Sequence, residues 1–258
     1  MVMEVDFSIV WGDIIIYFIA VFYAVVILTI ADIARKKRGL GSEITRRIVH
    51  LFAGAAIWTV PYYPHPWIAT LVGLTFVIML ILANTDRFSG FFAAMARPED
   101  LEHNSVRGPL WYAVSITVLT GIFTFTGYYI YYFVAAAAIQ IMMLGDGMSA
   151  PIGMKYGSNS RRIILGSIRS IPGTLAVFIF GFLGAILAFW WFGIVSVQVF
   201  ISGGSLLWVE MVVLAVIGAL SGSIVEFVSP KGTDNITLPL ISCLVMFLVA
   251  MQMGLIVL

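Results

Sequence analysis

Residues 14–34 read IIIYFIAVFYAVVILTIADIA, and the basic cluster Arg35-Lys36-Lys37-Arg38 follows at once. A helix needs about 20 apolar residues to cross the hydrocarbon core of a bilayer, and this run is long enough. A basic cluster directly after such a run is typical of the side that stays in the cytoplasm. The stretch therefore predicts a membrane-spanning helix whose C-terminal end faces the cytoplasm.

The rest of the chain has the same character. Of its 258 residues, 61% are hydrophobic and 10% are charged, and the mean hydropathy is +1.06. Soluble domains carry about 25% charged residues. The apolar runs are near-continuous rather than alternating, which favours helices over barrel strands. We expect an all-α polytopic membrane protein with one integral membrane domain over residues 1–258.

Eight spanning segments are expected along the chain. They lie at about 14–34, 48–61, 66–84, 109–126, 128–144, 172–193, 206–226 and 236–257. The second is short for a membrane span, so we expect it to tilt, to stop early or to extend through its polar neighbours.

All 14 lysines and arginines fall on one side of this arrangement. With both termini outside, four loops lie inside, and the positive-inside rule makes that side cytoplasmic. The inside loops hold Arg35, Lys36, Lys37, Arg38, Arg46 and Arg47; Arg87, Arg97 and Arg107; Lys155, Arg161, Arg162 and Arg169; and Lys231. The membrane is expected to be the plasma membrane in a prokaryote or the endoplasmic reticulum in a eukaryote.

Composition excludes several classes of function. The net charge of +1 gives no sign of a nucleic-acid partner, and the single cysteine, Cys243, excludes a disulfide framework and a zinc site built on cysteine pairs. The acidic residues Glu4, Asp6 and Asp13 near the first apolar run argue against a cleavable signal peptide. No inverted repeat of the kind that builds many transporters is visible.

Unusual polarity gathers at four cytoplasmic helix ends. In the first, Arg46 and Arg47 stand four and three residues before His50, which places them on one helical face. Snorkelling anchors would explain the arginines alone. His50 lies just inside an apolar run, where ionisable groups are usually functional.

The second stretch runs from Gly145 to Gly157 and carries Asp146 between two glycines. Ser149 is expected to cap a new short helix with Pro151 in its first turn. Asp146, Ala150, Gly153 and Gly157 would share one nearly bare face, which suits close approach of a phosphate or nucleotide to a helix start. Packing of small residues between membrane helices explains the glycines equally well, but not the carboxylate.

The third and fourth stretches open the sixth and eighth segments. Residues 161–174 deliver Arg161, Arg162 and Arg169 to a helix start, which suits a polyphosphate or an ordinary basic loop. Glu226 ends the seventh segment, and Asp234 and Asn235 begin the eighth, where one of them would serve as a helix cap. Carboxylates, cations and helix starts on one face are a layout for phosphoryl transfer with Mg²⁺.

In this order the four stretches resemble the dolichol kinase and phytol kinase family of CTP-dependent lipid-alcohol kinases. The motifs that carry the resemblance are Arg46-Arg47-x-x-His50-x-x-x-Gly54; Gly145-Asp146-x-x-x-Ala150-x-x-Gly153-x-x-x-Gly157; Arg169-Ser170-x-x-Gly173-Thr174; and Glu226 followed by Asp234-Asn235-x-x-x-Pro239. Arg107-Gly108-x-x-Trp111-Tyr112 is a weaker match. The resemblance covers most of the chain, from about residue 43 to 245.

The resemblance implies transfer of the γ-phosphate of CTP to a long isoprenoid alcohol of the dolichol or polyprenol type, with a divalent metal such as Mg²⁺. Phytol, geranylgeraniol and diacylglycerol are alternative acceptors. One position departs from the family: Pro172 stands where the motif usually has an acid, so the role of that acid is either lost or taken over by Glu226 or Asp234.

The expected site residues fall into three groups. The metal ligands are Asp146, Asp234 and Glu226, which with His50 are also the expected catalytic residues. The expected nucleotide-binding residues are Arg46, Arg47, Gly145, Gly147, Ala150, Gly153, Lys155, Gly157, Arg162, Arg169, Ser170, Gly173, Thr174 and Asn235. The sequence leaves open whether His50 or a carboxylate is the general base.

Two other functions are weighed against this one. A CDP-lipid synthase also uses CTP, but its Asp-Arg-x-x-Asp signature has no match, since Asp86-Arg87 lacks the second acid. A transporter would need polar residues near the middle of the bilayer, where these segments are mostly apolar. A catalytically silent relative is suggested only by Pro172.

Overall fold

The computed structural model describes residues 5–39, 41–83, 107–201 and 205–257. Arg87, Arg97 and most of the turn at 202–205 lie outside these residues. The chain divides into two compact units, Asp6–Val118 and Leu119–Leu258. A single domain over the whole chain stays a prediction.

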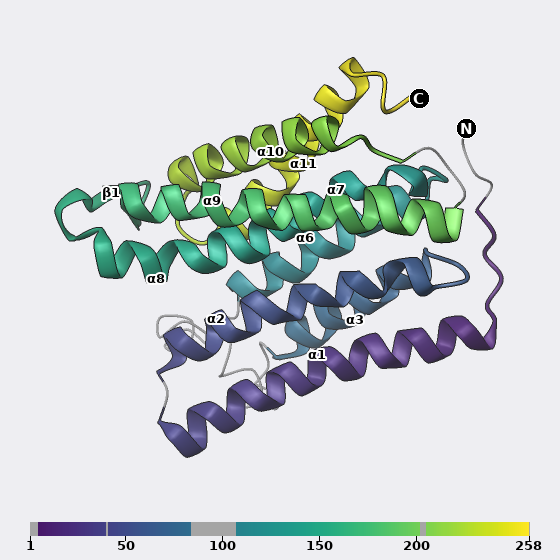
Figure 1. Cartoon of the computed structure of the whole chain (residues 1–258). Coiled ribbons are helices and arrows are strands. Elements are labelled where there is room, and N and C mark those ends of the chain that lie inside the picture. The colour runs from purple at the N-terminus through teal and green to yellow at the C-terminus, as the bar shows by residue number, and fades with distance from the viewer. Residues whose placement is uncertain (1–4, 40, 84–106, 202–204, 258) are drawn as a thin grey trace. The chain divides into compact units, whose positions relative to one another are not determined.

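The first unit is built from helices. They are α1 (Trp11–Arg38), α2 (Ser42–Ala53), the 3₁₀-helix η1 (Gly54–Tyr62), α3 (Ile68–Ala83) and most of α6 (Arg107–Thr124), as Figure 1 shows. Helix α1 contains the apolar run 14–34 and extends beyond it at both ends. It stops at Gly39, which has a left-handed φ of 62°. Its buried Leu28 and Ala31 pack with Val49 of α2 and Leu80 of α3.

The short second segment extends through its polar neighbours. Helix α2 begins at Ser42, before the apolar run, and the chain continues as 3₁₀-helix to Tyr62. Arg46, Arg47 and His50 therefore lie on a helix that leads directly into the apolar part. This was one of the three outcomes expected for so short a run.

A buried carboxylate holds the beginning of α1 to the turn before α3. Asp13 is fully buried; its carboxylate accepts from the backbone N–H of Val10 at 3.0 Å and from that of His65 at 2.9 Å. The His65 ring bonds to Asp13 through Nδ1 at 2.7 Å and lies 3.3 Å from Asp6 through Nε2. These contacts fix the start of α1 to the turn that precedes α3.

The second unit packs three helices around a fourth. Helix α7 (Tyr132–Gln140) is buried along its whole length, and α9 (Ile171–Ala188), α10 (Trp208–Val228) and α11 (Asp234–Gln252) contact it (Figure 1). The remaining elements are η2 (Tyr129–Tyr131), η3 (Ile141–Asp146), α8 (Gly147–Tyr156), η4 (Ser158–Ser160), β1 (Arg162–Ile164), β2 (Ser167–Arg169), η5 (Phe189–Val195) and η6 (Val197–Ile201).

Small residues let these helices approach closely. A Cβ added at Gly184 would lie 2.8 Å from the carbonyl oxygen of Gln140, and one at Gly222 would lie 2.9 Å from the Ile141 side chain. Close backbone packing through glycine is the usual way in which membrane helices associate, because lipid provides little hydrophobic driving force between them.

Strands β1 and β2 form a hairpin that the sequence did not predict. Arg162 pairs with Arg169, Ile163 with Ile168 and Ile164 with Ser167. Leu165 and Gly166 make the turn with φ values of 47° and 80°, the left-handed pair that a two-residue hairpin turn requires. The expectation was only a basic loop.

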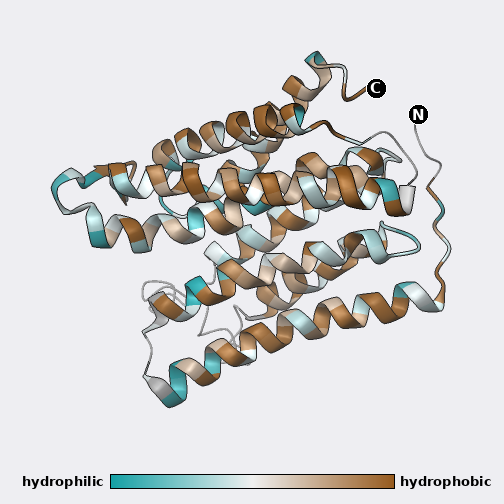
Figure 2. Cartoon of the chain, in the orientation of Figure 1, coloured by the Kyte–Doolittle hydropathy of each residue, from teal (hydrophilic) through white to brown (hydrophobic). Residues whose placement is uncertain are grey.

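The all-α polytopic membrane class is confirmed. Among the described residues, five helices are long and apolar enough to cross a bilayer: Trp11–Lys37, Tyr129–Tyr156, Ile171–Val199, Trp208–Val228 and Asp234–Gln252. Ile68–Leu82 and Gly108–Thr124 are shorter apolar helices. Figure 2 shows the apolar helix bodies and, in the second unit, hydrophilic residues near the hairpin. The count of eight spans and the side of each terminus stay predictions.

Candidate functional site

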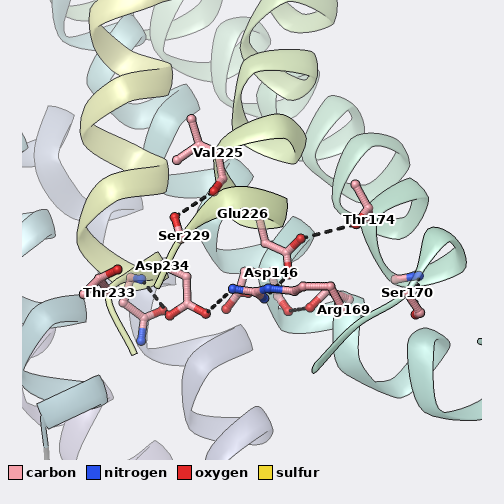
Figure 3. A network of polar contacts seen from close by, with 12 residues as sticks. Asp146, Arg169, Ser170, Thr174, Val225, Glu226, Ser229, Thr233 and Asp234 are labelled. Atoms are coloured by element: carbon pink, nitrogen blue, oxygen red, sulfur yellow. Dashed lines mark hydrogen bonds and ion pairs between the residues drawn. The ribbon is translucent and has the colours of Figure 1, made fainter. Parts of the chain in front are cut away.

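Arg169 is the centre of a buried polar network in the second unit. It is the last residue of β2 and is 8% exposed. Its Nη1 donates to Oε1 of Glu226, and its Nη2 donates to Oδ2 of Asp234 at 3.3 Å (Figure 3). Glu226 and Asp234 are 2% and 8% exposed, so one guanidinium bridges two buried carboxylates.

Two further residues complete the network. Thr174, in the first turns of α9, donates its hydroxyl to Oε2 of Glu226 at 3.5 Å. Asp146, at the end of η3, is close enough to Glu226 for the two charges to interact (Figure 3). The structure thus brings together the three carboxylates that the sequence singled out, from three separate helices.

Arg169 contacts carboxylates in this structure. The sequence assigned it to the phosphates of a nucleotide, and that role stays a prediction. Buried carboxylates are costly unless they are paired and hydrogen-bonded. Asp234 also accepts from the backbone N–H of Asn235 at 3.1 Å, which adds to the same compensation.

The turn into α9 explains how Pro172 is accommodated. Ser170 is the N-cap, and its hydroxyl accepts from the backbone N–H of Gly173 at 3.3 Å. Pro172 is the second residue of the helix, where a backbone N–H would have no partner within the helix. The Glu226 carboxylate accepts from Thr174 of the same turn, and a role for Glu226 in place of the missing acid stays a prediction.

The helix carrying Asp146 corrects one expectation. No new helix begins near Ser149, because η3 is a π-helical segment that runs directly into α8. Ser149 donates its hydroxyl to the carbonyl of Asp146 at 2.9 Å rather than capping a helix, and the Gly147 N–H bonds to the carbonyls of Gly145 and Leu144. The predicted helix start at this point is wrong. Single π-turns within α-helices are frequent at functional sites.

The glycines of this segment pack against α9. A Cβ at Gly153 would lie 2.8 Å from the Ser170 hydroxyl, and one at Gly157 would lie 2.6 Å from the Ser170 Cβ. Gly145 and Gly173 are equally close to backbone atoms of the facing helix. The packing alternative therefore describes these four positions, and a nucleotide role for them stays a prediction.

The other predicted binding residues of this unit belong to α8, β1 and α11. Lys155 and Arg162 are exposed, and the Lys155 amine lies 5.1 Å from the centre of the Tyr156 ring. Gly147 is buried and Ala150 half-buried on α8, and Asn235 is buried beside Asp234. Asp234 is the first residue of α11 and Thr233 its cap, so Asp234 is not the N-cap considered from sequence.

Arg46, Arg47 and His50 belong to the first unit. His50 is 9% exposed. Its ring lies 4.6 Å from that of Tyr112, centre to centre, and the Tyr112 hydroxyl donates to the His50 carbonyl at 2.9 Å. This contact was missed from sequence, although Tyr112 belongs to the weaker motif. That these three residues meet Asp146 in one site stays a prediction.

The described side chains do not by themselves form a complete metal site. Within residues 5–39, 41–83, 107–201 and 205–257, no group of three His, Cys, Asp or Glu side chains is arranged to hold a metal ion. Mg²⁺ usually takes one or two carboxylates and completes its shell with water and phosphate oxygens. Asp146, Asp234 and Glu226 offer carboxylate oxygens of this kind, but they would supply only part of the shell of a magnesium ion. Magnesium therefore stays a prediction.

The comparisons with known proteins agree with the motifs. The chain is 29% identical over 227 residues to a protein named phytol kinase from Synechocystis sp., covering 88% of this chain and 87% of that protein. It is 28% identical over 222 residues to a probable chloroplastic phytol kinase 2 of Oryza sativa subsp. japonica, covering 81% and 67%. No family model and no solved structure matches. Over most of its length, then, the chain is similar to proteins named phytol kinase, and the resemblance predicted from its four motifs is confirmed.

Proposed function

We propose that this chain is a membrane lipid-alcohol kinase, which transfers the terminal phosphate of a nucleoside triphosphate to the hydroxyl of an isoprenoid alcohol. The observation that carries the proposal is the buried network of Arg169, Glu226 and Asp234, which joins two of the motif stretches, with Asp146 of a third close to Glu226. The likeness to proteins named phytol kinase supports the same reaction class.

The proposed acceptor is an isoprenoid alcohol, and the proposed donor is CTP. The names of the relatives favour phytol over the longer dolichol or polyprenol that the family resemblance first suggested. Geranylgeraniol and diacylglycerol are the other acceptors to be compared. CTP follows from the family resemblance.

In the proposed reaction the alcohol oxygen attacks the γ-phosphorus, and the bond to the bridging oxygen of CTP breaks to release CDP. The hydroxyl proton passes to His50 or to a carboxylate of the network. A bound Mg²⁺ would neutralise charge on the phosphates, held by Asp146 and Asp234 with Glu226 beside them. Phosphoryl transfer depends mainly on positioning and charge stabilisation.

The cations have separate proposed tasks. Arg46, Arg47, Lys155 and Arg162 would hold phosphate oxygens, since guanidinium and ammonium groups are the usual partners of phosphate. Arg169 would exchange part of its contact with Glu226 and Asp234 for a phosphate once a divalent cation occupies the carboxylates. Asn235, buried beside Asp234, would orient one oxygen.

The direct test is transfer of label from γ-labelled nucleotides to lipid. The purified chain in lipid nanodiscs is given labelled CTP, ATP, GTP or UTP with phytol, geranylgeraniol, dolichol or diacylglycerol. We expect label in phytyl phosphate with CTP as the best donor. Absence of labelled lipid in every combination would contradict the proposal.

The released nucleotide product separates the rival functions. CDP indicates a kinase, whereas pyrophosphate indicates a CDP-lipid synthase. A transporter would show no CTP consumption that depends on the alcohol. Glu226→Gln should abolish transfer, and Glu210→Gln is its matched control. Glu210 caps the other end of α10 by accepting from the Leu207 N–H, a role that glutamine retains.

A further inference from the structure

The hairpin β1–β2 turns its apolar face away from the protein. Ile163 and Ile168 are paired across the strands and therefore share one face. They are 79% and 73% exposed. The opposite face carries Arg169, which is buried in the network of the candidate site. The usual order, with the apolar side inward and the polar side toward water, is reversed.

The hairpin is fixed at both ends. At its base Arg169 bonds to Glu226 and Asp234. At its tip the backbone N–H of Lys231 donates to the Leu165 carbonyl at 3.1 Å. An isolated two-stranded hairpin is marginally stable in water, and these contacts hold this one in place with the Leu165 side chain 62% exposed.

The hairpin leads without a linker into a membrane-crossing helix. Ser170 caps α9, and the span begins at Ile171. Ile171, Leu175 and Ile179 follow at intervals of four residues and are 70%, 54% and 46% exposed, as expected of a stripe that faces lipid. The hairpin therefore lies where the bilayer surface begins.

The exposed charged side chains that the structure describes next to the hairpin are basic. Lys155, Arg161, Arg162 and Lys231 are exposed near it, and the sequence contains no aspartate or glutamate from residue 147 to 209. Basic residues next to an apolar face are typical of elements that lie in the interface of an anionic membrane. The apolar face and the basic residues beside it are complementary to an anionic lipid surface.

We propose that the hairpin Arg162–Arg169 lies in the lipid interface at the cation-rich end of α9. Ile163, Leu165 and Ile168 enter the acyl-chain boundary, while the exposed cations contact anionic headgroups. Because Arg169 joins the hairpin to Glu226 and Asp234, the contact also sets the depth of the candidate site relative to the bilayer surface. The proposal does not depend on the kinase reaction.

The test measures the depth of single positions in the membrane. In a Cys243→Ala background, Ile163→Cys or Ile168→Cys is labelled with a polarity-sensitive nitrobenzoxadiazole dye in the full chain, reconstituted into phosphatidylcholine–phosphatidylglycerol vesicles. Asn159→Cys, at an exposed position just before the hairpin, is the matched control. We expect blue-shifted emission at 163 and 168, and quenching by doxyl-labelled lipid several-fold greater than at 159.

Two outcomes would overturn the proposal. Emission and quenching at 163 and 168 equal to those at 159 would mean that the face is in water, free for a protein partner. Quenching that does not fall when Arg161→Gln and Lys231→Gln are combined, or when phosphatidylglycerol is left out, would remove the role of anionic headgroups. Neither readout uses nucleotide, so a failed kinase assay would leave this result interpretable.

Discussion

The Arg169 guanidinium stabilises two carboxylates that would otherwise be buried without compensation. Removing one partner of a buried ion pair usually costs about 3–5 kcal/mol, and Arg169→Met removes the partner of Glu226 and Asp234 together. We expect a marked fall in the midpoint of thermal unfolding in detergent. Arg162→Met is the matched control, because Arg162 lies opposite Arg169 in the hairpin but is exposed. Equal losses in both variants would show that the network does not contribute to stability.

Asp146 is expected to matter for turnover more than for folding. Asparagine has nearly the same shape but lacks the negative charge that would hold a divalent cation beside the phosphates, so Asp146→Asn should lower turnover by roughly 10²-fold or more. Label transfer from CTP measures it. Asp32→Asn is the control, since Asp32 pairs with Arg35 and Lys36 on α1. Full activity of folded Asp146→Asn protein would contradict the assignment of Asp146 as a metal ligand.

The sequence predicted which residues of the second unit form the polar cluster, but not how they pair. Asp146, Glu226 and Asp234 stand out because ionisable groups at the ends of apolar helices are rare and usually functional. Arg169 was assigned to phosphate, because a sequence does not show which of several oppositely charged groups a long side chain contacts in the fold. His50 and Tyr112 are 62 residues apart, and no local pattern indicates such a contact.

Helices α8 and α9 depend on glycine where they meet. Gly157→Ala would place a Cβ against Ser170, the cap of α9, and overpacking of this kind typically costs about 1–3 kcal/mol. We expect lower thermal stability and reduced label transfer, because Ser170 positions the turn that carries Thr174. Gly41→Ala is the control, with nothing within 4 Å of the added Cβ. Unchanged stability of Gly157→Ala would mean that α9 shifts freely.

The contact between α1 and the turn before α3 should depend on pH. The hydrogen bond to Asp13 raises the pKa of His65 above its usual value near 6.5. A raised pKa in the folded state means that this contribution is fully present below pH ~6.5 and is lost as the pH rises through the folded-state pKa. Thermal unfolding from pH 5 to 9 should therefore show a decline in the wild type that is smaller in His65→Asn. Parallel curves would contradict the prediction.

Two elements differ from the expectation for a common reason. Glycines on both sides of Asp146, with Pro151 beyond, are typical of a helix boundary, yet the π-segment η3 keeps the helix continuous because its neighbours pack against it. The hairpin turn places Leu165 at a positive φ, which a residue other than glycine rarely adopts. In both places tertiary contacts override the local preference.

At the scale of the whole molecule, composition was sufficient for the class of fold. An apolar chain with few charges must satisfy its backbone within helices, and the described helices follow the predicted segments closely. Hydropathy does not show which glycine faces pack together or that the chain divides into two units. The reason is that helix faces exposed to lipid and helix faces buried in protein are equally apolar. The main structural prediction is that Arg46, Arg47 and His50 belong to the same site as the Arg169 network.

The orientation of the whole chain in the membrane decides which nucleotide pool the candidate site would meet. All lysines and arginines lie on the predicted inner side, so the turn before η2 should be outside and the hairpin end inside. In a Cys243→Ala background, Thr126→Cys and Asn159→Cys are both at exposed positions of the second unit. A membrane-impermeant maleimide applied to intact cells should label position 126 at once and position 159 only after lysis. The reverse pattern would place the network of Arg169 on the outer face, where cytosolic CTP is absent, and would exclude the proposed reaction in the cell even if the purified protein performed it.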